Sequence, residues 1–331
     1  MNKKKTLLTT LVVLSVALLA VLPLVIKKDS TLNLVITVLL YMTLASSWNV
    51  LGGYTGQTNL GHAAFFGIGS LTARLMWIAG VPFFLSFLAG GLVAVALALL
   101  IGIPAFKLRG VYFAIGTLAL AQILNLTVSN VFPEMSYNPA LADYQLVPRY
   151  YLFLALAVLT IGCAALLVNS RWGLGMMAVR EGEDAAESLG ISALRHKLLA
   201  LVTSAFFAGL VGGAFAYYHL SYYLSYTFSP EWTFDPMMMA YIGGTGTILG
   251  PIIGSVFFVL LKQLLVWNVG EYHLVIFGTL FILIVLFLPG GLIEAWKKIN
   301  HLLRHRNSSS GTGGLSSKFS SRLRWLQPKK G

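Results

Sequence analysis

Two short segments of this sequence place glycine and hydroxyl residues inside long apolar runs. They read Gly52-Gly53-Tyr54-Thr55-Gly56-Gln57 and Gly243-Gly244-Thr245-Gly246-Thr247, and neither carries a charge. Broken backbone at membrane depth is tolerated only where protein or a water-filled cavity satisfies its N–H and C=O groups. The segments therefore predict discontinuous helices that line a solute path. Close packing of helices through small residues is the alternative.

The candidate path and hinge residues belong to these two segments or directly follow them. His62 follows the first segment, where it would either bond an unwound carbonyl or pack as a structural histidine. The candidates are Gly53, Tyr54, Gly56, Gln57, Gly61, His62, Gly243, Gly244, Gly246 and Gly250.

Residue patterns for enzyme chemistry are missing from the sequence. It contains no Gly-x-x-x-x-Gly-Lys-Ser/Thr loop for ATP phosphates, no His-Glu-x-x-His zinc pattern and no Gly-x-Ser-x-Gly nucleophile elbow. The six histidines lack metal-ligand spacing, and Cys163 is the single cysteine. We therefore expect neither catalysis nor a bound cofactor or metal in this chain, and any ATP must be hydrolysed by a partner.

The stretch 169–196 is the richest in charge before the carboxyl-terminal region. Within it, apolar Met177, Ala185, Ala186, Leu189 and Ile191 alternate with acidic residues, as in a short amphipathic helix that lies in the groove of a partner. An ordinary solvated connection is the alternative. The candidate coupling residues are Arg180, Glu183, Asp184, Ala185, Ala186, Glu187 and Gly190.

Composition places these segments in a membrane protein. The 331 residues are 57% hydrophobic and only 10% charged, and the mean hydropathy is +0.80. Apolar runs of about 20 residues, each able to cross a hydrocarbon core of about 30 Å, recur along the chain. The predicted fold is an all-α polytopic bundle of about eight to ten spans with discontinuous helices. The candidate spans are 6–26, 31–50, 60–79, 82–103, 110–131, 149–168, 197–218, 232–249, 250–268 and 272–289.

Positive charge sets the expected orientation. The net charge of +12 comes from Lys and Arg at helix ends and in the tail, with no basic face for nucleic acid. Ten spans with both termini in the cytoplasm place 169–196 inside and leave 132–148, which has no Lys or Arg, outside. Lys27, Lys28 and Lys262 do not fit this pattern, which keeps eight or nine spans open. Arg74, inside the third span, is expected to snorkel to the outer interface.

Ten spans divide into five and five of opposite orientation, as in inverted-repeat transporters. The segment 63–67 resembles 204–209, a faint hint of such a repeat. We assign 1–300 to one transmembrane domain. Residues 301–331 form a basic, Ser- and Gly-rich tail that we expect to be disordered and excluded from the fold.

Several of these motifs together resemble one family. Glu183-Asp184-Ala185-Ala186 followed by Gly190 resembles the coupling-loop motif of bacterial ABC importer permeases. Gly53–Gly69, Leu108–Ala119, Gly243–Gly254 and Leu288–Leu292 resemble, in the same order, signatures of the membrane permeases of branched-chain amino acid importers.

The resemblance implies a transport subunit of the bacterial inner membrane, with both termini cytoplasmic. It implies a second homologous permease, two cytoplasmic ATPase subunits that hold ATP and Mg²⁺, and an external substrate-binding protein. The implied substrates are branched-chain or other hydrophobic amino acids, and related permeases carry urea and short amides.

An ion-coupled secondary transporter of a small polar solute is the alternative of another class. That mechanism needs ion ligands or proton carriers inside the membrane. Acidic residues are nearly absent from the predicted spans, and Asp235, for example, maps to an outer end. A membrane-embedded enzyme is disfavoured by the missing catalytic patterns.

Overall fold

A computed structural model of the chain describes residues 3–26, 28–132, 144–219 and 223–269, with short pieces between 275 and 296. Within these ranges every element is a helix, which confirms the all-α prediction. The helices are α1 (Lys3–Val25), α2 (Asp29–Asn49), the π-helical turn η1 (Val50–Tyr54), α3 (His62–Ile78), α4 (Phe83–Ala105), α5 (Val111–Val131), α6 (Leu146–Val168), α7 (Arg171–Glu181), α8 (Glu183–Ser188), α9 (Ala193–Tyr218), α10 (Leu224–Thr227), α11 (Glu231–Gly243) and α12 (Leu249–Val269).

The first nine predicted spans each coincide with a helix. Six described helices are long and apolar enough to cross a membrane, namely α2 with η1, α4, α5, α6, α9 and α12. Helix α3 has 17 residues, and α11, predicted to reach residue 249, ends at Gly243 after 13. The chain is therefore a multi-pass membrane protein with at least one shortened helix. Most of the tenth span and all of the tail 301–331 lie outside the described residues.

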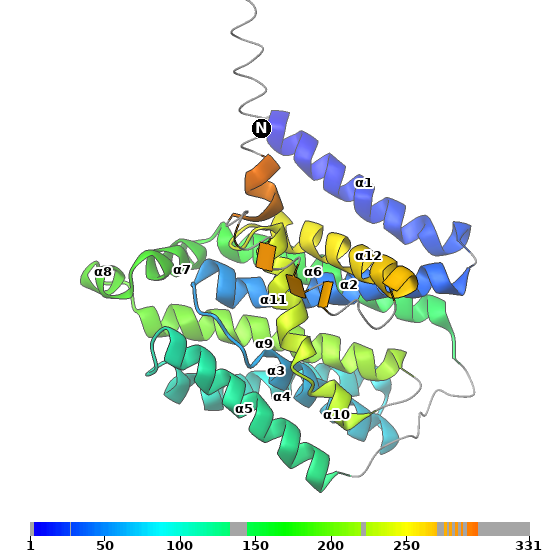
Figure 1. The fold of residues 1–331 in the computed structure, drawn as a ribbon, viewed down its shortest axis with the longest axis horizontal. Coiled ribbons are helices and arrows are strands. Elements are labelled where there is room, and N and C mark those ends of the chain that lie inside the picture. Colours follow the sequence, from blue (N-terminus) through cyan, green and yellow to red (C-terminus); the bar gives the residue numbers. More distant parts are fainter. Residues whose placement is uncertain are drawn as a thin grey trace, which may run out of the picture.

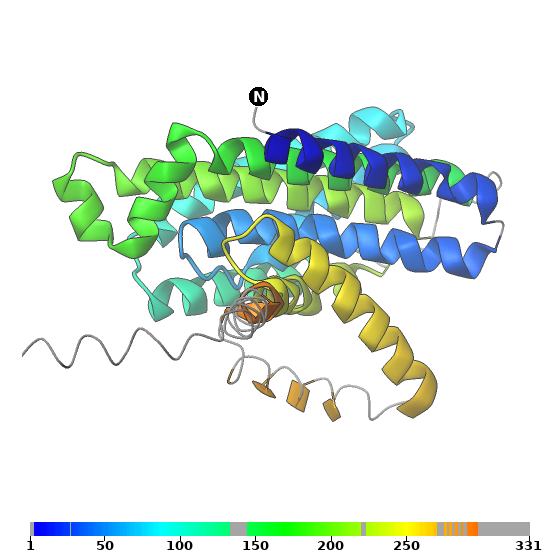
Figure 2. The same cartoon turned by 90° about the horizontal axis from the view of Figure 1, so that it is seen from above.

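Helix α9 is the centre of the bundle. It packs against α2, α3, α4 and α6, and α1 lies at the periphery against α6 (Figures 1 and 2). Helices α7 and α8 project beyond one end of the long helices, whereas α10 lies toward the opposite end (Figure 1). The connection 169–196 and the loop that precedes α11 therefore lie on opposite sides, as the predicted topology requires.

Small residues bring α3, α4 and α9 into backbone contact. A Cβ at Gly69 would overlap the backbone of Gly209, and a Cβ at Gly209 would lie 2.5 Å from Ala94 Cβ and 2.9 Å from Gly90 O. Membrane helices gain van der Waals contact in this way because lipid supplies no hydrophobic drive between them. These three helices therefore form a tight unit.

The five-plus-five repeat stays a prediction, and helix packing accounts for the sequence likeness that suggested it. Segments 63–67 and 204–209 lie on α3 and α9, which pack against each other through small residues. In such a repeat the third span would match the eighth, which is α11, rather than the seventh.

Two buried arginines bind the carboxyl end of α9. Arg74, expected to snorkel, is instead fully buried and donates to Ala216 O at 2.9 Å. Arg149, also fully buried, donates to Tyr217 O at 3.0 Å, and its guanidinium lies 3.9 and 4.1 Å from the ring centres of Tyr144 and Tyr217. Cations at a helix carboxyl end satisfy open carbonyls and oppose the helix dipole, which explains the burial of both charges.

The carboxylate of Asp235 joins α11 to α12 and α2. Asp235, mapped from the sequence to an outer end, lies in the second turn of α11. Its Oδ2 accepts from Lys262 Nζ at 3.0 Å and from Tyr41 Oη at 3.2 Å. The pair accounts for the lysine inside a predicted span, because charges within membrane helices persist where they are mutually compensated.

We predict that Gly209→Leu lowers the free energy of unfolding by about 1–3 kcal/mol, because the added atoms must force α3 and α4 away from α9. Gly162→Leu is the matched control, since no atom lies within 4 Å of a Cβ built there on α6. Thermal unfolding of the detergent-solubilised variants measures the difference. Equal midpoints for Gly209→Leu and the wild type would contradict the tight unit.

Candidate functional site

The two glycine segments meet at one junction. After η1, the chain runs without helix from Thr55 to Gly61, and a second break separates Gly243 from Leu249. The Asn49 side chain joins the breaks: its Nδ2 donates to Thr247 O at 2.9 Å, and its Oδ1 accepts from Gly246 N at 2.9 Å. One amide thus satisfies a donor and an acceptor that the second break leaves open.

Other side chains satisfy further backbone groups of the breaks. Thr247 Oγ1 donates to Gly244 O at 2.8 Å and accepts from Gly250 N at 3.0 Å. Asn59 Oδ1 accepts from Gly61 N, while Thr117 Oγ1 accepts from Leu60 N. The breaks are therefore fixed by protein groups, as broken helices inside a membrane must be.

Close packing explains part of the glycine pattern. A Cβ at Gly243 would overlap Gly250 O, and a Cβ at Gly250 would overlap Gly244 O, so α11 and α12 pack through these positions. A Cβ at Gly53 would lie 2.7 Å from Gly246 N, which places the two segments in direct contact. The packing alternative thus describes the α11–α12 hairpin, and the junction between Gly53 and Gly246 is the candidate hinge.

Three glycines of the two breaks have backbone conformations that other residues rarely adopt. The φ angle is +69° at Gly56, +124° at Gly244 and +73° at Gly246. A residue with a Cβ is strained there, so the sharp turns on both sides of the junction depend on glycine.

The remaining candidates of the first segment lie around a tightly packed core. His62 is fully buried, with Nε2 3.1 Å from Ser47 Oγ, so it packs as a structural histidine rather than bonding an unwound carbonyl. Tyr54 is buried, Gln57 is half-buried, and Gly61 packs against the Thr117 backbone.

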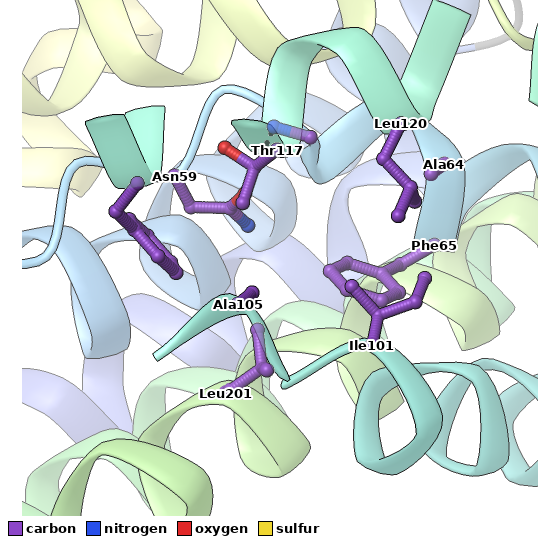
Figure 3. Close-up of a pocket in the computed structure, with 10 residues that line it drawn as sticks. Asn59, Ala64, Phe65, Ile101, Ala105, Thr117, Leu120 and Leu201 are labelled. Carbon is purple, nitrogen blue, oxygen red and sulfur yellow. Dashed lines mark hydrogen bonds between the residues drawn. The ribbon is translucent and has the colours of Figure 1, made fainter. Parts of the chain in front are cut away.

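Two small hollows adjoin the first break. Figure 3 shows one between α3, α4, α5 and α9, lined mainly by apolar side chains, with Asn59 and Thr117 as its polar members. The other lies at the junction itself, between Ser46, Asn49, Tyr54 and Pro251. The Ser46 hydroxyl is buried and has no hydrogen-bond partner among the described residues. The junction therefore combines polar groups with apolar walls.

The connection 169–196 is folded as α7 and α8 and tied to the bundle by charge. Glu183 Oε2 lies 2.5 Å from the Nζ of Lys197, a residue of α9 that is 1% exposed. Asp184 Oδ1 lies 3.2 Å from Arg109 Nη1 in the turn between α4 and α5, and both side chains are largely exposed. The buried pair holds α8 more firmly than the exposed one, which water and salt weaken.

The candidate coupling residues divide into inward and outward groups. Ala186 is buried beside Val179 and Ala193, so with Glu183 it fixes the shape of the loop. Asp184, Ala185, Glu187 and Gly190 are exposed. Leu189, which is 81% exposed, forms the apolar tip between them. An exposed leucine among charges, directly after a projecting helix, is compatible with the docking role that the sequence predicts.

Arg180 connects this loop to the junction. Its Nη1 donates to Gly53 O at 2.7 Å, across 127 residues of sequence. Of the site as a whole, sequence reasoning missed Asn49 and Lys197, whereas Leu189 belonged to the apolar pattern predicted for the loop. An asparagine at the end of an apolar run, directly before a glycine segment, was the available signal for Asn49.

We predict that Asn49→Ala lowers the free energy of unfolding by about 1–3 kcal/mol, because Gly246 N and Thr247 O lose their partner. Asn268→Ala is the matched control: that amide bonds Leu264 O of its own helix at an exposed position. Thermal unfolding in detergent measures both. Equal losses for the two variants would show that Asn49 does not join the breaks.

The match to a known protein family covers the regions that form this site. The profile of the family described as "Branched-chain amino acid transport system / permease component" matches residues 30–285, which include both breaks, α7 and α8. No solved structure shows significant similarity to the chain.

Two relatives illustrate the similarity. The high-affinity branched-chain amino acid transport system permease protein LivM of Escherichia coli K12 is 29% identical over 330 residues, covering 88% of this chain and 75% of that protein. The probable branched-chain amino acid transport permease protein LivM of Methanocaldococcus jannaschii is 23% identical over 313 residues, covering 77% and 90%. With a family profile matched over residues 30–285, this chain belongs to the permease components of branched-chain amino acid transport systems.

Proposed function

We propose that the chain is the translocation subunit of an ATP-driven importer of branched-chain amino acids. Membership of the permease family supports the class of protein. The observation that carries the mechanism is the junction of two broken segments at the side of the bundle from which α7 and α8 project. A transporter needs a path that can rearrange beside a surface on which ATP hydrolysis acts. The junction would supply the path, and α7 and α8 would supply the surface.

The proposed assembly follows from what the chain lacks and what it exposes. It contains no phosphate-binding loop, so ATP and Mg²⁺ would be held by two cytoplasmic ATPase subunits. The exposed face around Leu189 would enter a groove of one ATPase. A second permease would complete the path, and an external binding protein would deliver the substrate. The complex would lie in the bacterial inner membrane, with both termini cytoplasmic.

The junction suggests how opening would occur. The tight unit of α3, α4 and α9 resists deformation, whereas the breaks are held largely by individual hydrogen bonds. ATP-driven movement of α8 would then shift the broken segments relative to that unit and alternate the open side. Each state must form contacts that the other lacks, because a ligand biases an equilibrium only by its differential affinity.

We predict that Leu189→Asp removes the ATPase subunits from the purified complex, because a carboxylate replaces the apolar tip of the docking surface. Leu189→Met, which keeps an apolar side chain, is the control. Mass spectrometry of the gently solubilised complex measures ATPase recovery. Full recovery with Leu189→Asp would exclude this surface as the docking site.

A second prediction concerns the path. In a Cys163→Ala background, a cysteine at Gln57 is expected to react with a water-soluble thiol reagent at a rate that changes at least threefold when ATP is added to the complete complex. Gln57 lies in the first break, whereas Leu166, 77% exposed on α6, faces outward and supplies the control position. An unchanged rate at Gln57 would show that the first break does not move during transport.

A further inference from the structure

The last turn of α7 ends against the junction of the two breaks. Arg180 Nη1 donates to Gly53 O at 2.7 Å. The same guanidinium lies against Gly246, where an added Cβ would overlap Nη1. One side chain from the cytoplasmic loop thus contacts both broken segments.

Glycine provides the room for this side chain. A Cβ at Gly56 would lie 3.0 Å from Arg180 Cγ and 3.5 Å from Arg180 Cβ. Gly56 therefore accommodates the aliphatic part of the arginine, while Gly246 accommodates its guanidinium. Both glycines have left-handed φ, so the backbone conformation and the contact with Arg180 each depend on the missing side chain.

Contacts along helix α7 connect Arg180 to α8. Ser170 caps its amino end by accepting from the backbone N–H groups of Trp172 and Gly173. A Cβ at Gly175 would overlap the His196 ring of α9, and Val179 is buried against the α8 residue Ala186. Since α7 packs on α8 through Val179, a displacement of α8 is passed to the adjacent Arg180.

The other charged contacts of the loop end elsewhere. Glu183 binds Lys197 on α9, and Asp184 binds Arg109 in the turn between α4 and α5. Arg180 instead donates its hydrogen bond to a broken segment. Asn49 joins the breaks to each other but belongs to α2.

We propose that Arg180 is the positioning residue that transmits movement of the ATPase-docking loop to the translocation path, by holding Gly53 and Gly246 in register with α7. The inference rests on the proposed function, whose coupling step it assigns to one side chain. A guanidinium suits this role because its planar fork can contact two backbone segments at once.

The test compares Arg180→Met with Lys107→Met in the complete complex reconstituted in liposomes. Lys107 is an exposed cation in the turn between α4 and α5, so both variants lose one positive charge near the same face. Uptake of labelled leucine and ATP hydrolysis are measured together. We expect Arg180→Met to lower the amount of leucine taken up per ATP hydrolysed at least tenfold, Lys107→Met to leave the ratio unchanged, and Arg180→Lys to give an intermediate ratio.

Two results would overturn the inference. One is an unchanged ratio in Arg180→Met. The other is loss of the ATPase subunits from that variant, which would assign Arg180 to docking. Failure of the proposed function appears differently, as absence of ATP-dependent leucine uptake by the wild-type complex.

Hydrogen–deuterium exchange of the purified permease tests the contact without transport. Arg180→Met is expected to speed amide exchange in segments 50–57 and 244–248 at least tenfold, whereas Lys107→Met leaves it unchanged. Equal exchange in both variants would show that Arg180 does not hold the breaks, whatever the protein transports.

Discussion

Every backbone group that leaves a helix inside a membrane must find a partner within the protein, and the centre of this chain is organised by that requirement. The two breaks lie far apart in sequence, yet Asn49, at the end of α2 before the first break, satisfies two backbone groups of the second break. Thr247 and Asn59 serve further groups. A pair of interruptions held by a few polar side chains can be rearranged at lower cost than continuous helices. The same constraint that makes the breaks expensive therefore makes them suitable as a moving part.

Charge is used sparingly and at defined points. Arg74 and Arg149 converge on the carboxyl end of α9, where open carbonyls accept their hydrogen bonds. Asp235 and Lys262 compensate each other between α11 and α12. Lys197 anchors α8 at the other end of α9. The central helix is thus bound by buried cations near both ends.

The mechanical consequence is a division between rigid and adjustable contacts. Backbone contact through Gly69, Gly90 and Gly209 leaves little freedom between α3, α4 and α9, because close-packed interfaces resist small deformations. The junction instead relies on directional bonds from Asn49 and Arg180, which can be exchanged for others. Movement imposed on α7 and α8 would therefore be absorbed at the junction.

The sequence by itself determined the membrane class, the positions of nine helices, the two breaks and the charged loop that carries the candidate coupling residues. These features depend on local composition: apolar runs long enough to span a bilayer, glycine where the helix is interrupted, and charge where the chain leaves the membrane. Only the tertiary structure decided that the breaks meet, that Arg180 reaches Gly53, and that Glu183 and Ala186 face inward while Leu189 faces outward. It also decided that Arg74 is buried rather than snorkelling and that Asp235 pairs with Lys262. Such partnerships join residues up to about 200 positions apart, and hydropathy and motif spacing carry no information about which helix faces lie side by side.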